Sequence, residues 1–163
     1  MKKLTKVLFV CMGNICRSPT AHAIFEKQVQ EKKLTDQIEV ESAGTHSRVY
    51  HHEGALPDSR SMKAAKEKGI DMSYIRSRQF LSEDFYEYDY IIVMDDANMH
   101  SVQSMLPAVS LMHKIHKLTE YADDKNYTEI SDPYYSGGFM PIFELIENCC
   151  SNLLNVITKS QPK

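Results

Sequence analysis

Two short, unbroken runs of apolar residues constrain the fold of this chain more than any other feature of its sequence. They are residues 7–10 (Val-Leu-Phe-Val) and residues 90–94 (Tyr-Ile-Ile-Val-Met). Both have the length of a strand and no alternating polar residues, which is typical of strands buried on both faces of a parallel sheet. Residues 38–41 form a third, shorter candidate strand with β-branched side chains.

Helical patterns occupy the segments between these runs. Ser18 and Pro19 are expected to start one helix, as its N-cap and first helical residue. A second helix is predicted over residues 59–68, with Gly69 as its C-cap. A third, long helix is predicted near the C-terminus from apolar residues spaced three and four apart. These residues are Ile142, Ile146, Cys149, Leu153 and Val156.

The chain of 163 residues has the length of one domain, and no repeat or linker divides residues 1–163. Strands that alternate with helices imply right-handed crossovers and a doubly wound α/β sheet with helices on both faces. Ligands of such sheets bind at the carboxyl ends of the strands. The loop after the first apolar run is therefore the predicted site.

That loop, residues 11–19, reads Cys-Met-Gly-Asn-Ile-Cys-Arg-Ser-Pro. Gly13 permits backbone angles closed to other residues and Asn14 tolerates a left-handed conformation, so successive N–H groups can converge on an anion. A helix N-terminus just beyond favours a phosphate there. Cys11 would be stabilised as the nucleophilic thiolate. Arg17 can hold two phosphate oxygens at once, and Ser18 can donate its hydroxyl to the sulfur.

Residues 10–19 resemble the signature of the low-molecular-weight protein tyrosine phosphatases, and blocks similar to that family continue along the chain. These blocks are residues 42–45, 57–60, 69–71, 78–79, 94–98 and 132–135. The resemblance implies a single phosphatase domain with a flavodoxin-like, four-stranded parallel sheet. It also implies hydrolysis of phosphotyrosine on proteins, and of small aryl phosphates, through a phosphocysteine intermediate that releases inorganic phosphate.

Asp132 is the candidate general acid. A tyrosyl leaving group has a pKa near 10, so protonation of its oxygen by a carboxylic acid typically gains 10² to 10⁴ in rate. Asp132 precedes Pro133, which stiffens its backbone, and follows a polar, loop-like stretch. The resemblance also assigns the acid to this Asp-Pro-Tyr block. The same carboxylate would then activate the water that hydrolyses the intermediate.

The remaining predicted site residues surround the phosphate or support the loop. Besides Ser18, the phosphate is expected to contact the loop residues Met12, Gly13, Asn14, Ile15 and Cys16. Tyr50, Tyr134 and Tyr135 are expected to flank the substrate ring. Asn14, Ser42 and Asp95 are expected to hold the loop in shape, as the resemblance also implies. Oxidation could join Cys16 to Cys11 and protect the nucleophile reversibly.

Two segments depart from the family pattern. Many relatives carry a histidine that contacts the loop asparagine, whereas this chain offers Tyr74 or Ile75. The loop over residues 46–52 is longer than usual. Its histidine pair, like His113 and His116, is expected to consist of surface or loop residues and not to bind metal.

Composition and charge argue against some classes of binding partner. The formal net charge of −3 argues against nucleic acid or an anionic membrane. The first apolar run is too short for a secretory signal, and no stretch approaches the roughly 20 residues of a membrane span. We therefore expect a cytoplasmic protein with reduced cysteines, no metal and no cofactor, acting as a monomer or weak dimer.

Three alternatives stay open on the sequence. An arsenate reductase would share the fold and loop but needs further cysteines to relay a disulfide, and residues 82–89 contain none. A protein-arginine phosphatase tends to have threonine after the loop asparagine, where this chain has Ile15. A non-catalytic phosphate-binding module would need neither Cys11 nor Asp132.

Overall fold

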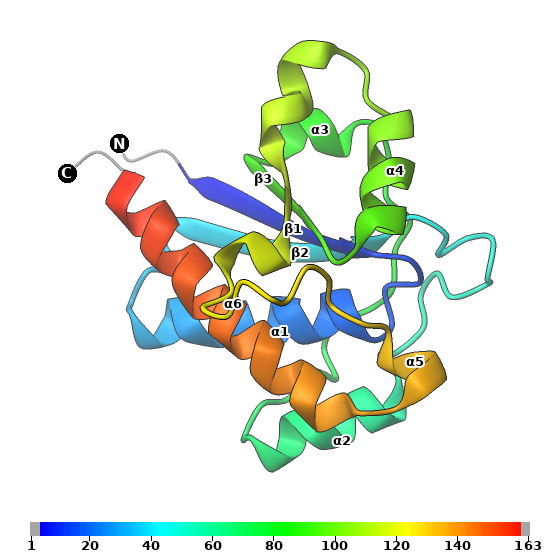
Figure 1. Cartoon of the computed structure of the whole chain (residues 1–163), viewed down its shortest axis with the longest axis vertical. Coiled ribbons are helices and arrows are strands. Elements are labelled where there is room, and N and C mark those ends of the chain that lie inside the picture. Colours follow the sequence, from blue (N-terminus) through cyan, green and yellow to red (C-terminus); the bar gives the residue numbers. More distant parts are fainter. Residues whose placement is uncertain (1–3, 161–163) are drawn as a thin grey trace.

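The computed structural model of the chain describes residues 4–160 (Figure 1). Four parallel strands form one sheet in the order β2-β1-β3-β4. The strands are β1 (Thr5–Cys11), β2 (Ile38–Gly44), β3 (Tyr90–Val93) and β4 (Ile115–Lys117). The predicted doubly wound, four-stranded parallel sheet is confirmed.

Helices cover both faces of the sheet, as expected (Figure 1). One face carries α1 (Arg17–Glu31), α2 (Ser59–Glu67) and α6 (Phe139–Ser160). The other carries α3 (Asp84–Glu87), α4 (Asp96–Ser104) and the 3-10 helix η1 (Val109–Lys114). Two short helices, η2 (Leu118–Tyr121) and α5 (Pro133–Ser136), lie in the connection from β4 to α6.

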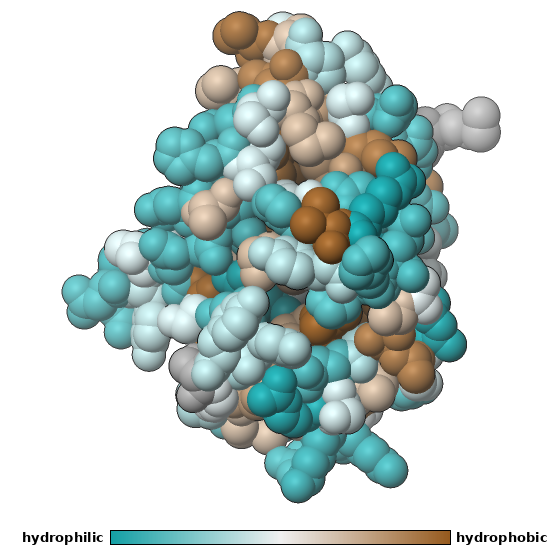
Figure 2. All heavy atoms as spheres, turned by 90° about the vertical axis from the view of Figure 1, so that its right-hand side faces the viewer, coloured by the Kyte–Doolittle hydropathy of each residue, from teal (hydrophilic) through white to brown (hydrophobic). Residues whose placement is uncertain are grey.

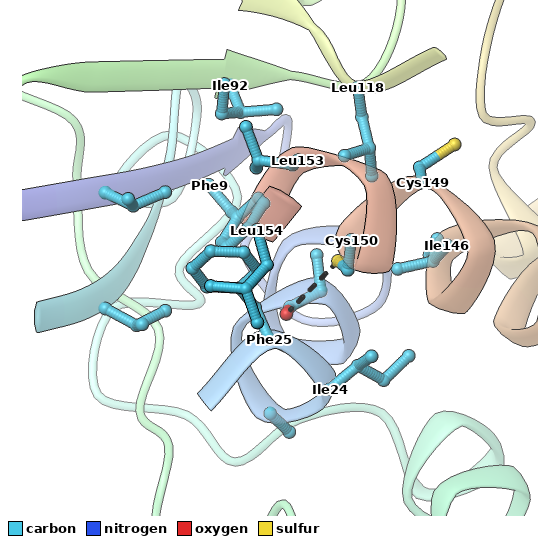
Figure 3. Packing of buried hydrophobic residues seen from close by; sticks show 14 of the residues in the cluster. Phe9, Ile24, Phe25, Ile92, Leu118, Ile146, Cys149, Cys150, Leu153 and Leu154 are labelled. Atoms are coloured by element: carbon cyan, nitrogen blue, oxygen red, sulfur yellow. Dashed lines mark hydrogen bonds between the residues drawn. The ribbon is translucent and has the colours of Figure 1, made fainter. Parts of the chain in front are cut away.

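The central strand β1 explains why its sequence shows no alternation. Val7 and Phe9 pack into the cluster with α1 and α6, whereas Leu8 and Val10 pack into a second cluster on the opposite face. Figure 3 shows the first cluster, in which the ring of Phe9 meets that of Phe25 edge to face at 5.5 Å. Over residues 7–10 both faces of the strand are fully buried.

Helix α1 begins earlier than predicted. Its N-cap is Cys16 and its first residue is Arg17, so Ser18 is not the cap. The Ser18 hydroxyl instead approaches Cys11 and Asn14 in the loop. Pro19 is the third helical residue, which is tolerated because N–H groups of the first turn have no partner within the helix.

Helix α2 agrees closely with its prediction. The Asp58 side chain caps it by accepting from the Arg60 N–H, and Gly69 follows the C-cap with a φ of 75°.

Helix α6 is present, but its buried residues are not all those predicted. Val156 is 44% exposed, and Leu154 and Ile157 are buried instead. Positions spaced 3.5 residues apart on average rotate gradually around a helix of 3.6 residues per turn, so the last of them leaves the buried face.

No helix within residues 4–160 is both long and apolar enough to cross a bilayer.

Candidate active site

The predicted phosphate loop lies at the carboxyl end of β1, between Cys11 and the start of α1. Figure 2 looks onto this edge of the sheet, whose surface is largely hydrophilic with separate hydrophobic areas. Neighbouring segments hold the loop by its carbonyl groups. Backbone N–H groups of Thr45, His46 and Asp58 donate to the carbonyls of residues 11, 12 and 15 at 2.7–2.9 Å. These bonds fix the backbone of the loop, in which the Asn14 N–H points to the Cys11 sulfur.

At two glycines, Gly13 and Gly44, the absence of a side chain lets neighbouring atoms come close to the loop. Asn14 is left-handed, with a φ of 57°, as the sequence allowed, whereas Gly13 does not have a positive φ. A Cβ on Gly13 would stand 3.1 Å from Cδ2 of His52. A Cβ on Gly44, at the end of β2, would stand 2.8 Å from the Met12 carbonyl oxygen and 2.9 Å from the Asn14 nitrogen. Gly44 therefore permits close approach of strand and loop.

Asn14 ties the loop to its surroundings and is fully buried. Its Nδ2 donates to Ser18 Oγ at 2.8 Å, and its Oδ1 accepts from the Arg78 N–H at 2.9 Å. Tyr74 and Ile75 stand where the family pattern has a histidine, and the backbone amide of Arg78 bonds the Asn14 side chain instead. Ile75 packs in the core, and the Tyr74 hydroxyl donates to Glu26 at 3.2 Å.

Ser42 supports a different element from the one predicted. Its hydroxyl lies 2.9 Å from Nδ1 of His22, on helix α1, and not against the loop. The Nε2 of His22 in turn lies 3.1 Å from Glu26 Oε2. Ser42 was expected to hold the phosphate loop in shape, and the hydrogen bond it makes instead joins strand β2 to helix α1 through His22.

The Cys11 sulfur lies at the base of the loop and is buried. The Asn14 N–H donates to it at 3.3 Å, and the Ser18 hydroxyl lies 3.1 Å away. Because Asn14 Nδ2 already donates to Ser18 Oγ, the Ser18 proton points elsewhere. Its nearest acceptors are the Cys11 sulfur and the Ala43 carbonyl, the latter at 3.3 Å.

Arg17 is buried beside this sulfur. Its Nη1 donates to Asp95 Oδ2 at 2.6 Å and to the Ile130 carbonyl at 2.8 Å. Its Nη2 lies 3.6 Å from Asp132 Oδ2. Burial alone would lower the pKa of Arg17, but electrostatic interactions with Cys11, Asp95 and Asp132 and the hydrogen bond to Asp95 together raise it. The guanidinium is thus fixed in position and remains cationic.

Asp132 lies at the N-cap of α5, where its Oδ1 accepts from the Tyr134 N–H at 3.0 Å. Pro133 is the first residue of that helix. The carboxylate is partly exposed and faces a pocket of about 270 Å³. The pocket is lined by Cys11, Met12, Gly13, Ile15, Cys16, Arg17, Tyr50, His52, Asp132, Tyr134 and Tyr135.

The structure brings most of the predicted residues together at this pocket. All three predicted tyrosines line it, and the rings of Tyr134 and Tyr135 meet edge to face at 5.0 Å. Asn14 and Ser18 contact Cys11, and Asp95 contacts Arg17, so all three touch residues that line the pocket. His52, expected to be a surface or loop histidine, also belongs to the lining, which the sequence did not single out.

The other cysteines differ from Cys11 in their surroundings. Burial, and then the nearby charge of Asp58, raises the pKa of Cys16 to about 12. Burial also raises the pKa of Cys149 to about 11. Cys149 and Cys150 lie on α6 within the core (Figure 3), where the Cys150 thiol faces the Ala21 carbonyl.

The family described as low molecular weight phosphotyrosine protein phosphatase matches residues 6–163. The chain belongs to this family. The low molecular weight protein-tyrosine-phosphatase YfkJ of Bacillus subtilis is 37% identical over 158 residues, covering 97% of this chain and 99% of that protein. The low molecular weight phosphotyrosine protein phosphatase of Mus musculus is 37% identical over 151 residues, covering 91% and 92%.

Solved structures of this family share the fold described above. The crystal structure of YfkJ gives a TM-score of 0.92 at 36% identity and covers 98% of both chains. An arginine phosphatase from Drosophila gives a TM-score of 0.86 at 33% identity, covering 96% of this chain and 100% of the other. The predicted family and fold class are therefore confirmed.

Proposed function

We propose that this protein hydrolyses phosphotyrosine in proteins, with Cys11 as nucleophile and Asp132 as general acid. The observation that carries the proposal is the position of the Cys11 sulfur. It accepts from the Asn14 N–H and lies within reach of the Ser18 hydroxyl, beside a permanently cationic Arg17. Donors and a positive charge around a sulfur stabilise the thiolate, which is the nucleophilic form.

The same surroundings suit a phosphate dianion. We expect the backbone N–H groups of the loop to form an anion nest, and the N-terminus of the 15-residue helix α1 adds its positive dipole end. Arg17 lines the pocket while Asp95 and Ile130 hold its Nη1. The rest of the guanidinium is then preorganised for phosphate oxygens.

Two balanced steps complete the reaction. The Cys11 thiolate attacks phosphorus, the S–P bond forms, and the bond to the tyrosyl oxygen breaks as Asp132 gives that oxygen its proton. In the second step the Asp132 carboxylate takes a proton from water as the water oxygen attacks phosphorus. The S–P bond breaks, inorganic phosphate leaves, and both the thiolate and the protonated acid are restored.

The aromatic lining favours an aryl substrate. Tyr50, Tyr134 and Tyr135 stand around the mouth of the pocket, and aromatic pairs contribute about 0.5–1.5 kcal/mol beyond burial. Phosphotyrosine-containing proteins are thus the partners we propose. A cytoplasmic location and a monomeric or weakly dimeric state stay predictions from the sequence.

The first experiment measures hydrolysis of p-nitrophenyl phosphate and of a phosphotyrosine peptide with a metal chelator present. Cys11→Ser is expected to lower turnover at least about a thousandfold while still binding phosphate. Cys149→Ala is the matched control, because that thiol is buried on α6. Unchanged turnover in Cys11→Ser would refute the nucleophile.

Related activities are separated by the choice of substrate. The similarity to the Drosophila arginine phosphatase makes phosphoarginine peptides the necessary comparison. Ile15 lines the pocket and favours phosphotyrosine, so faster hydrolysis of phosphoarginine would overturn the substrate assignment. Arsenate reduction is disfavoured because Cys149 and Cys150 are buried in the core. Thioredoxin-coupled arsenate turnover faster than aryl phosphate hydrolysis would reverse that ranking.

A further inference from the structure

Arg60, on helix α2, contacts the segment that carries Asp132. Its guanidinium carbon lies 5.3 Å from the ring centroid of Tyr134 and 4.7 Å from that of Phe139, both within the range of cation–π attraction. Its Nη2 also lies 3.4 Å from the Tyr134 carbonyl oxygen, to which it donates. One side chain thus contacts both helix α5 and the first residue of α6.

Arg60 is itself held in place by Asp58. Its Nε and Nη2 donate to the two carboxylate oxygens at 3.1 and 3.0 Å, a paired geometry that fixes the guanidinium plane. Burial alone would raise the pKa of Asp58, but hydrogen bonds from Arg60 reverse this and lower it. The Asp58 N–H donates to the Ile15 carbonyl at 2.7 Å. Arg60 is therefore tied, through one residue, to the phosphate loop.

Arg60 is also linked to the candidate acid Asp132, through Tyr134. The Tyr134 N–H donates to Asp132 Oδ1, so a shift of Tyr134 displaces the carboxylate. Upstream, the segment is anchored at Ile130, whose N–H donates to the Met94 carbonyl. Downstream, Gly137 and Gly138 have φ values of 77° and 76°, and a Cβ added to either would meet no atom within 4 Å. Helix α5 thus lies between an anchor and a glycine pair, with Arg60 against it.

We propose that Arg60 is a positioning residue that keeps the Asp132 carboxyl group over the phosphate loop. The inference rests on the proposed role of Asp132 as general acid. Without Arg60, helix α5 turns about Ile130 and the glycine pair, and the acid leaves hydrogen-bond reach of the departing oxygen. Displacements of about 1 Å can cost up to a hundredfold in rate.

The test uses two substrates that differ in their need for an acid. Phenyl phosphate has a leaving group of high pKa, whereas p-nitrophenolate leaves readily without protonation. Their kcat/KM values report the step in which the leaving group departs. Arg60→Met is expected to lower kcat/KM for phenyl phosphate about tenfold and that for p-nitrophenyl phosphate by about twofold or less.

Two further variants distinguish the loss of this contact from a general loss of folding. Arg60→Lys keeps the charge but lacks the planar fork, and is expected to show the same unequal losses. Arg76→Met is the matched control, because Arg76 is also exposed but donates to the Ser73 and Ile75 carbonyls, away from the pocket. It is expected to leave both values unchanged.

A double-mutant cycle separates positioning from general stability. In an Asp132→Asn background, Arg60→Met is expected to have no further effect on phenyl phosphate, since no acid is left to position. Equal losses on both substrates, or an undiminished effect in that background, would overturn the inference. If Asp132→Asn alone shows no dependence on the leaving group, the proposed function of Asp132 fails instead.

Discussion

Arg17 and Asp95 form a 2.6 Å hydrogen bond that joins the phosphate loop to the end of the neighbouring strand β3. Asp95 also caps helix α4 by accepting from the Asn98 N–H at 2.7 Å. One carboxylate thus fixes both the direction of the guanidinium and the start of a helix. The position of Arg17 depends on the register of β1 and β3, which pair directly.

Asp95→Asn keeps the cap but removes the charge that holds Arg17. Hydrogen bonds to charged groups contribute about 1.5–3 kcal/mol, so we expect phosphate to inhibit the variant about tenfold more weakly. The measurement is the competitive inhibition constant of inorganic phosphate. Asp96→Asn is the control, since that carboxylate is exposed and pairs with Lys117 at 3.0 Å. Equal effects in the two variants would contradict a role for Asp95 in holding Arg17.

Gly44→Ala places a methyl group against the backbone of the phosphate loop. Overpacking of this kind typically costs about 1–3 kcal/mol, and the displaced loop should also lower kcat/KM. Gly54→Ala is a useful contrast, because Gly54 has a φ of 86° but open space around it. That variant should lose stability without losing activity. Thermal unfolding and kcat/KM are measured for both variants. Full activity in Gly44→Ala would contradict the prediction, because the loop would then have adjusted to the added methyl group.

Cys16→Ser tests whether Cys16 protects the nucleophile. Peroxide converts the Cys11 thiolate to sulfenic acid, and attack by Cys16 forms a disulfide and releases water. Wild-type protein should recover activity with dithiothreitol, whereas Cys16→Ser should recover much less. Cys149→Ser serves as the control, and equal recovery in all three proteins would exclude the protective disulfide.

The same disulfide should form faster as the pH rises. The pKa of Cys16, raised to about 12, leaves a small thiolate fraction near neutrality. That fraction grows about tenfold per pH unit below the pKa, and so should the rate of disulfide formation from preformed sulfenic acid. Stopped-flow measurements between about pH 6 and 9 should show this rise in wild type and not in Cys16→Ser, and a flat profile in wild type would contradict attack by the Cys16 thiolate.

Glu26 makes a small, pH-dependent contribution to stability. The hydrogen bond from His22 is the largest cause that lowers the pKa of Glu26 below its ordinary value of 4.5. The stabilisation is therefore present above that value and is lost as the pH falls through the lower folded value. Because the side chain is 33% exposed, we expect less than about 1 kcal/mol. Urea unfolding of Glu26→Gln should differ from wild type at pH 7 and converge with it in acid.

The sequence predicted the parts of the fold whose signals are local. Strands β1 and β3 show continuous apolar runs because both faces are buried, and α2 has its own cap and terminating glycine. Strand β4 gave no such signal. It has three residues, and His116 and Lys117 in it are only partly buried. Pairing with β3, and not its own composition, makes it a strand.

The residues of the candidate site could be predicted where they lie in one continuous segment. They could not where they depend on contacts between segments that are distant in sequence. Cys11, Arg17 and the loop between them are contiguous, and Asp132 stands in a recognisable block. The amide of Arg78 binds Asn14 through its backbone, which no side-chain pattern can reveal. His52 and Arg60 reach their partners only because loop 45–58 and helix α2 fold against residues distant in sequence.

The segment after Gly44 is fastened to the phosphate loop at its two ends, by the amides of Thr45 and His46 and by that of Asp58. Its middle, with Tyr50 and His52, supplies part of the pocket wall. Insertions and substitutions between the two fastenings can therefore alter which proteins are accepted while the chemical apparatus stays intact. For an engineer, this is the stretch to randomise when new selectivity is wanted.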